Sequence, residues 1–101
     1  MNAGARVLIV EDEHALRVAL RDILDSEGYR TQCAPDGAAG LQLIVAEKPD
    51  LILLDLMMPK LDGYALCAEL RRLGIRTPVL MVTAKGQVPD RVTGLDSGAD
   101  D

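Results

Sequence analysis

The aliphatic run LILL at residues 51–54, which leads without a break into Asp55, constrains the fold most strongly. Pro49 and Pro59 bracket this stretch. A short apolar run without polar alternation is typical of a strand buried on both faces, as at the centre of a parallel sheet. Ligands of open α/β sheets bind at the carboxyl ends of the strands. We therefore predict a central strand with Asp55 at its chemically active end.

Composition narrows the class of protein further. The 101 residues fit one domain, and with two Tyr and no Phe or Trp the core must be mainly aliphatic. The net charge of -5 argues against nucleic-acid binding. No apolar stretch reaches the ~18 residues of a membrane helix, so we expect a soluble, cytoplasmic protein. Cys33 and Cys67 lack metal-binding spacing and are expected to be ordinary small side chains.

The remaining apolar patterns predict alternating strands and helices. Strands are expected at Arg6–Val10, Tyr29–Ala34 and Val79–Val82, and helices at Ala15–Ser26, Ala38–Ala46, Tyr64–Leu73 and Val88–Ser97. Gly28 and Gly74 mark helix ends, and Asp36 is a candidate N-cap. Strict alternation implies a doubly wound α/β domain over residues 1–101, with a parallel sheet in the strand order 2-1-3-4.

Oxygen-bearing side chains follow three of the four strands. Glu11 and Asp12 come after the first, Asp55 after the third and Thr83 after the fourth. The strand order brings the ends of the first and third strands together, so the three acids should converge. Two carboxylates ~4 Å apart repel by about 4 kcal/mol at an effective dielectric of 20, so the site needs a cation or a proton. Oxygen ligands favour Mg²⁺, beside which a carboxylate can attack phosphorus and Thr83 could bond a phosphoryl oxygen.

Three motifs carry a family resemblance: VEDE at 10–13, LDLMMP at 54–59 followed by DG at 62–63, and VTA at 82–84. In this order and spacing they resemble the receiver domain of two-component response regulators, which implies a flavodoxin-like fold. Residues 91–101 further resemble the winged-helix (OmpR/PhoB-like) subfamily of transcription factors.

The resemblance implies a role for each matched residue. Asp55 would accept a phosphoryl group from a histidine kinase, and Thr83 would be the switch hydroxyl. Mg²⁺ would be bound by Asp55 and Asp12, by Glu11 through water, and by the backbone carbonyl of Met57. The domain would catalyse its own phosphorylation and dephosphorylation as a regulatory phosphoacceptor controlling an output, transcription, outside this chain.

One departure from the family pattern concerns the C-terminal end. Family members continue after the GADD at 98–101 into a fifth strand with an aromatic switch residue and a Lys-Pro, and then a fifth helix. These are absent from the sequence given, and neither Lys60 nor Lys85 matches the family's lysine. We therefore expect a receiver domain that is incomplete at its C-terminus. An open edge on the fourth strand would favour a homodimer or domain-swapped oligomer.

Several alternatives stay open beside this interpretation. The acids could cap helices, because Asp and Glu favour helix N-termini, and Thr83 could be a simple N-cap. A phosphohydrolase of the haloacid dehalogenase kind is a second possibility, but it would need an acid two residues after the nucleophile Asp55, where this sequence has Met57. A flavodoxin-like cofactor binder would need a Ser/Thr/Gly-rich phosphate loop after the first strand. A phosphorylation-incompetent receiver, acting only as a protein-interaction or oligomerisation module, is the main alternative.

Overall fold

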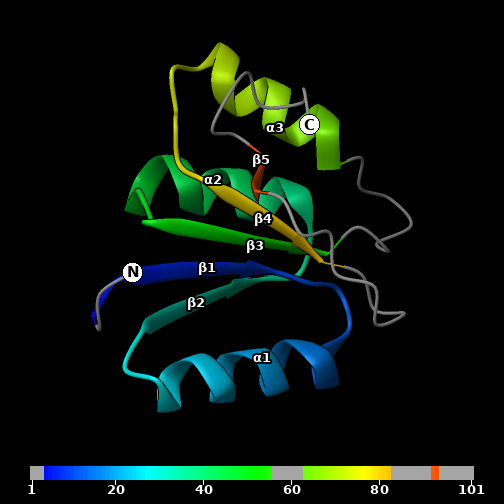
Figure 1. Cartoon of the computed structure of the whole chain (residues 1–101). Coiled ribbons are helices and arrows are strands. Elements are labelled where there is room, and N and C mark those ends of the chain that lie inside the picture. Colours follow the sequence, from blue (N-terminus) through cyan, green and yellow to red (C-terminus); the bar gives the residue numbers. More distant parts are fainter. Residues whose placement is uncertain (1–3, 56–62, 83–91, 94–101) are drawn as a thin grey trace.

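The computed structural model describes residues 4–55, 63–82 and 92–93, and a parallel sheet forms its centre (Figure 1). The strands are β1 (Arg6–Val10), β2 (Arg30–Ala34), β3 (Leu51–Asp55), β4 (Val79–Val82) and β5 (Val92–Thr93). They lie in the order β2-β1-β3-β4-β5, and every pair except β4–β5 is parallel. The predicted order 2-1-3-4 is therefore confirmed.

Three helices cover the two faces of the sheet. They are α1 (His14–Ser26), α2 (Gly37–Glu47) and α3 (Gly63–Arg72), and each begins within one residue of its predicted start. Figure 1 shows α1 on one face and both α2 and α3 on the other, which is the doubly wound arrangement. No helix in the described part of the chain is long and apolar enough to cross a membrane.

Local signals set the helix boundaries. The carboxylate of Asp36 accepts a hydrogen bond of 2.8 Å from the backbone N–H of Ala39, which makes it the predicted N-cap of α2. Gly28 and Gly74 adopt positive φ angles of 93° and 80° just after α1 and α3, where glycine is favoured. Lys48 ends α2 in the same left-handed region, at φ 52°.

Two hydrophobic clusters, one on each face of the sheet, explain why the sequences of β1 and β3 are continuous apolar runs. Alternate residues of each strand point to opposite faces, so a strand covered on both sides needs apolar residues throughout. The cluster toward α1 contains Val7, Ile9 and Leu53, and the cluster toward α2 and α3 contains Leu8, Val10, Ile52 and Leu54. Cys67 is buried in the second cluster, Cys33 is half-buried, and no disulfide links these two described residues.

Gly40 allows α2 to lie close to β1 just before the acidic turn. A Cβ at this position would lie 3.0 Å from Cγ2 of the fully buried Val10. Gly40→Leu is expected to lower the free energy of unfolding by about 1–3 kcal/mol through overpacking, despite a helix-propensity gain of up to about 1 kcal/mol. Urea unfolding measures the change. The control is Ala38→Leu, on the exposed side of α2; an equal loss in both variants would refute the close-packing explanation.

The predicted helix over Val88–Ser97 is wrong at the two residues of that segment that the structure describes. Val92 and Thr93 form β5, antiparallel to β4, with Val92 opposite Leu80 and Thr93 opposite Val79. An edge strand presents unpaired backbone groups, and β-branched residues fit a pleated surface well. The β4 edge is thus paired at Val79 and Leu80 instead of fully open, and self-association through it stays a prediction.

Candidate metal centre

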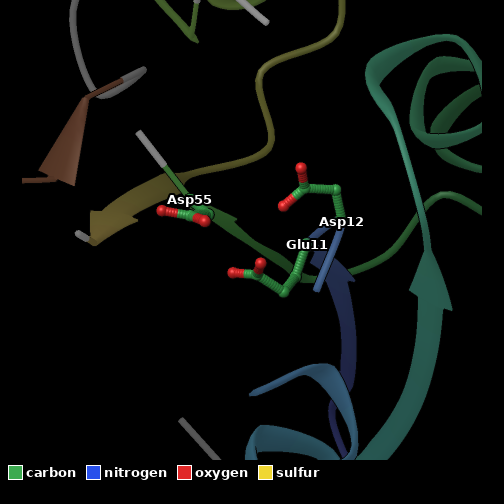
Figure 2. Close-up of side chains that lie close together, drawn as sticks. All are labelled: Glu11, Asp12 and Asp55. Atoms are coloured by element: carbon green, nitrogen blue, oxygen red, sulfur yellow. The ribbon is translucent and has the colours of Figure 1, made fainter. Parts of the chain in front are cut away.

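Three carboxylates converge at the carboxyl ends of β1 and β3 (Figure 2). One oxygen from each of Glu11, Asp12 and Asp55 lies within 4.8 Å of the others. Glu11 and Asp55 are buried, with 1% and 3% of their surface exposed, whereas Asp12 is exposed. The cluster therefore combines two desolvated acids with one at the solvent boundary.

Strand pairing brings these residues together. Val10 lies opposite Leu54 in the parallel β1–β3 pair, so the residues that follow, Glu11 and Asp55, emerge side by side. The N–H of Glu11 donates to the carbonyl of Ala34 at 3.0 Å, which continues the β1–β2 ladder by one residue. The acidic turn is therefore an extension of the sheet and its position follows from the register.

Glu11 is further held by its own neighbours in the turn. Its Oε2 accepts a 2.9 Å hydrogen bond from the backbone N–H of Glu13. Its Oε1 is buried and has no hydrogen-bond partner among the described residues. A buried oxygen without a donor is costly unless a proton or a cation satisfies it. A proton shared with Asp55 or a bound cation would satisfy this atom.

The electrostatics of the cluster point the same way. Burial and the adjacent carboxyl of Asp55 together raise the pKa of the Glu11 carboxyl to about 7, with burial the larger cause, while the Glu13 N–H opposes the rise. Without a cation Glu11 therefore keeps its proton to a higher pH than an ordinary glutamate does. A bound cation would favour the ionised form instead.

Arg17 is a residue of this region that the sequence analysis missed. Its Nη1 donates to the carbonyl of Glu11 at 2.8 Å, and its Nη2 lies 3.2 Å from Nδ1 of His14. The first contact anchors the acidic turn to α1, and the second gives His14 a neighbour outside the carboxylate cluster. The only sequence signal was a cation in the first turn of the helix that follows the acids.

The structure therefore brings together Glu11, Asp12 and Asp55 from the predicted site. Met57 and Thr83 lie outside the described residues. Three closely spaced carboxylates, with no cysteine in the cluster and His14 turned to Arg17, form an oxygen-only donor set. Such a set suits a hard divalent cation that keeps several waters.

Comparison with known proteins identifies the family. The profile of the response regulator receiver domain matches residues 7–101. The chain belongs to this family. Receiver domains are regulatory domains of two-component systems, so the carboxylate cluster lies in a domain of signalling proteins.

Curated relatives support the same assignment. Response regulator MprA of Mycolicibacterium vanbaalenii is 47% identical over 96 residues, which cover 95% of this chain and 42% of the relative. The MprA of Mycobacterium ulcerans is 46% identical over 98 residues, covering 97% and 42%. The chain thus spans less than half the length of these relatives.

Solved receiver structures share the fold. The receiver domain of the Francisella response regulator 1452 has a TM-score of 0.77 and 35% identity, covering 96% of this chain and 80% of that one. TrrA from Thermotoga maritima, solved in complex with Mg²⁺-BeF, has a TM-score of 0.73 and 31% identity, covering 79% and 70%.

Proposed function

We propose that this receiver domain accepts a phosphoryl group on Asp55, assisted by Mg²⁺ bound to Glu11, Asp12 and Asp55. The observation that carries the proposal is the cluster of three carboxylates within 4.8 Å, two of them buried, at the adjoining ends of β1 and β3. The chain's membership of the receiver family supplies the reaction class.

Mg²⁺ fits the donor set better than softer metals do. It binds through one or two carboxylates and keeps waters, whereas zinc sites use His and Cys. Asp12 and Asp55 would contact the ion directly, Glu11 would do so through water, and the carbonyl of Met57 would complete the protein's share. The related TrrA was solved with Mg²⁺-BeF, which supports this choice.

The transfer itself uses one oxygen of Asp55. That oxygen attacks the phosphorus of a phosphohistidine or of acetyl phosphate, and a new O–P bond forms. The P–N bond of the histidine, or the P–O bond of the acetyl donor, breaks, and its electron pair leaves with the donor. Mg²⁺ held by Glu11, Asp12 and Asp55 would supply positive charge against the negative phosphoryl oxygens. Water later attacks the phosphorus, the O–P bond to Asp55 breaks, and inorganic phosphate leaves, which restores the Asp55 carboxylate. Before this step Thr83 is proposed to bond a phosphoryl oxygen.

The partners follow from the reaction. A histidine kinase is the expected donor, and the phosphorylated domain would control an output, transcription, carried by sequence outside these 101 residues. The domain would be a regulatory phosphoacceptor that catalyses its own modification and does not turn over a separate substrate. The match covers only 42% of the MprA of Mycolicibacterium vanbaalenii, so that protein is long enough to contain such an output segment.

Beryllofluoride, a mimic of the phosphoryl group, tests the proposal by fluorine NMR. A bound resonance is expected in wild type with Mg²⁺ and none after chelation. A folded wild-type domain with no bound resonance under saturating Mg²⁺ would favour the interaction-module alternative.

Asp12→Asn is expected to weaken Mg²⁺ binding strongly. Losing one unit charge ~4 Å from a divalent ion corresponds to about 8 kcal/mol at an effective dielectric of 20, and the exposure of Asp12 to water reduces this to on the order of a 10- to 100-fold loss of affinity. Calorimetric titration with Mg²⁺ measures it. Asp22→Asn, on the exposed side of α1, is the matched control. Equal affinities in the two variants would remove Asp12 from the metal site.

A further inference from the structure

A cavity lies at the opposite end of the sheet from the carboxylates. It has a volume of about 450 Å³ and is lined by the C-terminal end of α2 and the connection from α3 to β4. Figure 1 shows these two segments near each other, away from the carboxyl ends of β1 and β3. Both segments lead into the amino ends of strands, whereas Glu11 and Asp55 stand at carboxyl ends. The cavity is therefore separate from the candidate metal centre, and its size falls within the range of small-molecule pockets.

The walls of this cavity are apolar. Ile44 and Val45 of α2 line it together with Leu73 and Ile75. Four large hydrophobic side chains are exposed in the described part of the chain, and two of them, Val45 at 51% and Leu73 at 45%, line this one cavity. Exposed apolar side chains gathered in one hollow offer a ligand more burial than the same residues scattered singly.

Two cations also line the cavity, in a chain whose net charge is -5. They are Lys48 and Arg76, both exposed, and neither has an ion-pair partner among the described residues. By contrast, Arg6 and Arg72 are each paired with a glutamate. The local charge is thus opposite in sign to the charge of the whole chain.

The backbone of Lys48 gives an independent observation. It is the only described non-glycine residue with a positive φ, at φ 52° and ψ 62°. Glycine is the usual residue at this position after a helix, and a side chain there costs roughly 1 kcal/mol. A strained residue is retained only where the surroundings require it. Lys48 thus supplies a cation to the cavity lining at a position where glycine would fit the backbone more easily.

Hydrogen bonds within the protein hold the part of the cavity wall formed by residues 73–77. Nη2 of Arg71 donates to the carbonyl of Thr77 at 2.8 Å, and Nη1 donates to the carbonyl of Ile75. The N–H of Ile75 donates to the carbonyl of Leu70 at 2.8 Å. A wall held by these bonds loses little freedom on binding, which favours affinity.

We propose that this cavity binds a small amphipathic carboxylate. Its apolar body would pack against Val45, Leu73 and Ile75, and its carboxylate would pair with Lys48 and Arg76. An uncharged apolar molecule would leave the cations unused, and a compact inorganic anion would leave the apolar walls exposed. This inference goes beyond the phosphoacceptor function and does not depend on it.

Octanoate is the probe for the test, followed through the amide chemical shifts of the isotope-labelled domain. Saturable shifts are expected at residues 44–48 and 73–77 at millimolar octanoate. Octanol is expected to bind several-fold more weakly. Shifts that do not saturate, that map to other residues, or that are equally strong with octanol would overturn the proposal.

Lys48→Gly separates binding from folding. Glycine adopts the left-handed conformation freely, so the melting temperature should stay the same or rise. Octanoate affinity is expected to fall about 2- to 5-fold, as for loss of one surface ion pair, and further in Lys48→Gly combined with Arg76→Gln. Arg21→Gln on α1 is the control and should bind octanoate normally. Unchanged affinity in the double variant would refute the carboxylate site.

Discussion

Asp55→Asn is expected to abolish formation of a covalent phosphoryl adduct. An amide oxygen is a poor nucleophile compared with a carboxylate, and its phosphorylated form would not persist. The substitution keeps the shape of a side chain that is 3% exposed at the end of β3. Intact-protein mass spectrometry after incubation with acetyl phosphate and Mg²⁺ measures the result, with no mass gain expected in the variant.

Folding is controlled for in the same experiment. Replacing one of three clustered carboxylates reduces like-charge repulsion, so the unfolding midpoint of Asp55→Asn should not fall in metal-free buffer. Asp22→Asn should gain a phosphoryl group as wild type does. Modification of a folded Asp55→Asn domain to the wild-type extent would place the acceptor elsewhere.

The metal-free domain is expected to lose stability as the pH rises toward neutrality. The pKa of Glu11 is raised from 4.5 to about 7 in the folded state. Below pH 4.5 both states hold the proton, and between 4.5 and 7 only the folded state holds it. The free energy of unfolding therefore falls with rising pH across this window, by about 3 kcal/mol, and levels off above 7. Urea unfolding from pH 5 to 8 measures the slope.

Glu11→Gln and Mg²⁺ provide two controls for this pH dependence. The variant removes the titrating group, so its unfolding free energy should be nearly flat over the same window. Saturating Mg²⁺ should reverse the loss near pH 7, because an ion at 100 times its Kd adds about 2.7 kcal/mol. An equal pH slope in wild type and Glu11→Gln would assign the effect to other groups.

Much of the fold could be predicted because local and global signals agree at particular residues. The runs that end at Val10 and Leu54 are apolar on both faces, and a parallel sheet covered by helices on both sides buries both. Asp36 marks the start of α2 because its carboxylate accepts a backbone hydrogen bond, and Gly28 marks the end of α1 because glycine adopts a positive φ easily. The convergence of Glu11 with Asp55 follows from the strand order alone.

Other features depend on contacts that a sequence does not display. Val92 and Thr93 lie in a segment whose residue pattern predicts a helix. They form a strand because the edge of β4 offers backbone partners at Val79 and Leu80. Arg17 reaches the Glu11 carbonyl only because α1 lies beside the acidic turn. Gly40, which lies inside the predicted helix over Ala38–Ala46, is a point where α2 meets Val10.

The central claim is that Asp55 accepts phosphoryl groups with the help of a metal held by its neighbours. Mapping the site of modification tests this most directly. Wild-type domain is treated with acetyl phosphate with Mg²⁺ or with chelator, the acyl phosphate is trapped by reduction, and the peptides are sequenced by mass spectrometry. The predicted result is modification at Asp55 alone and only with Mg²⁺. Modification at another residue, or equal modification after chelation, would contradict the claim.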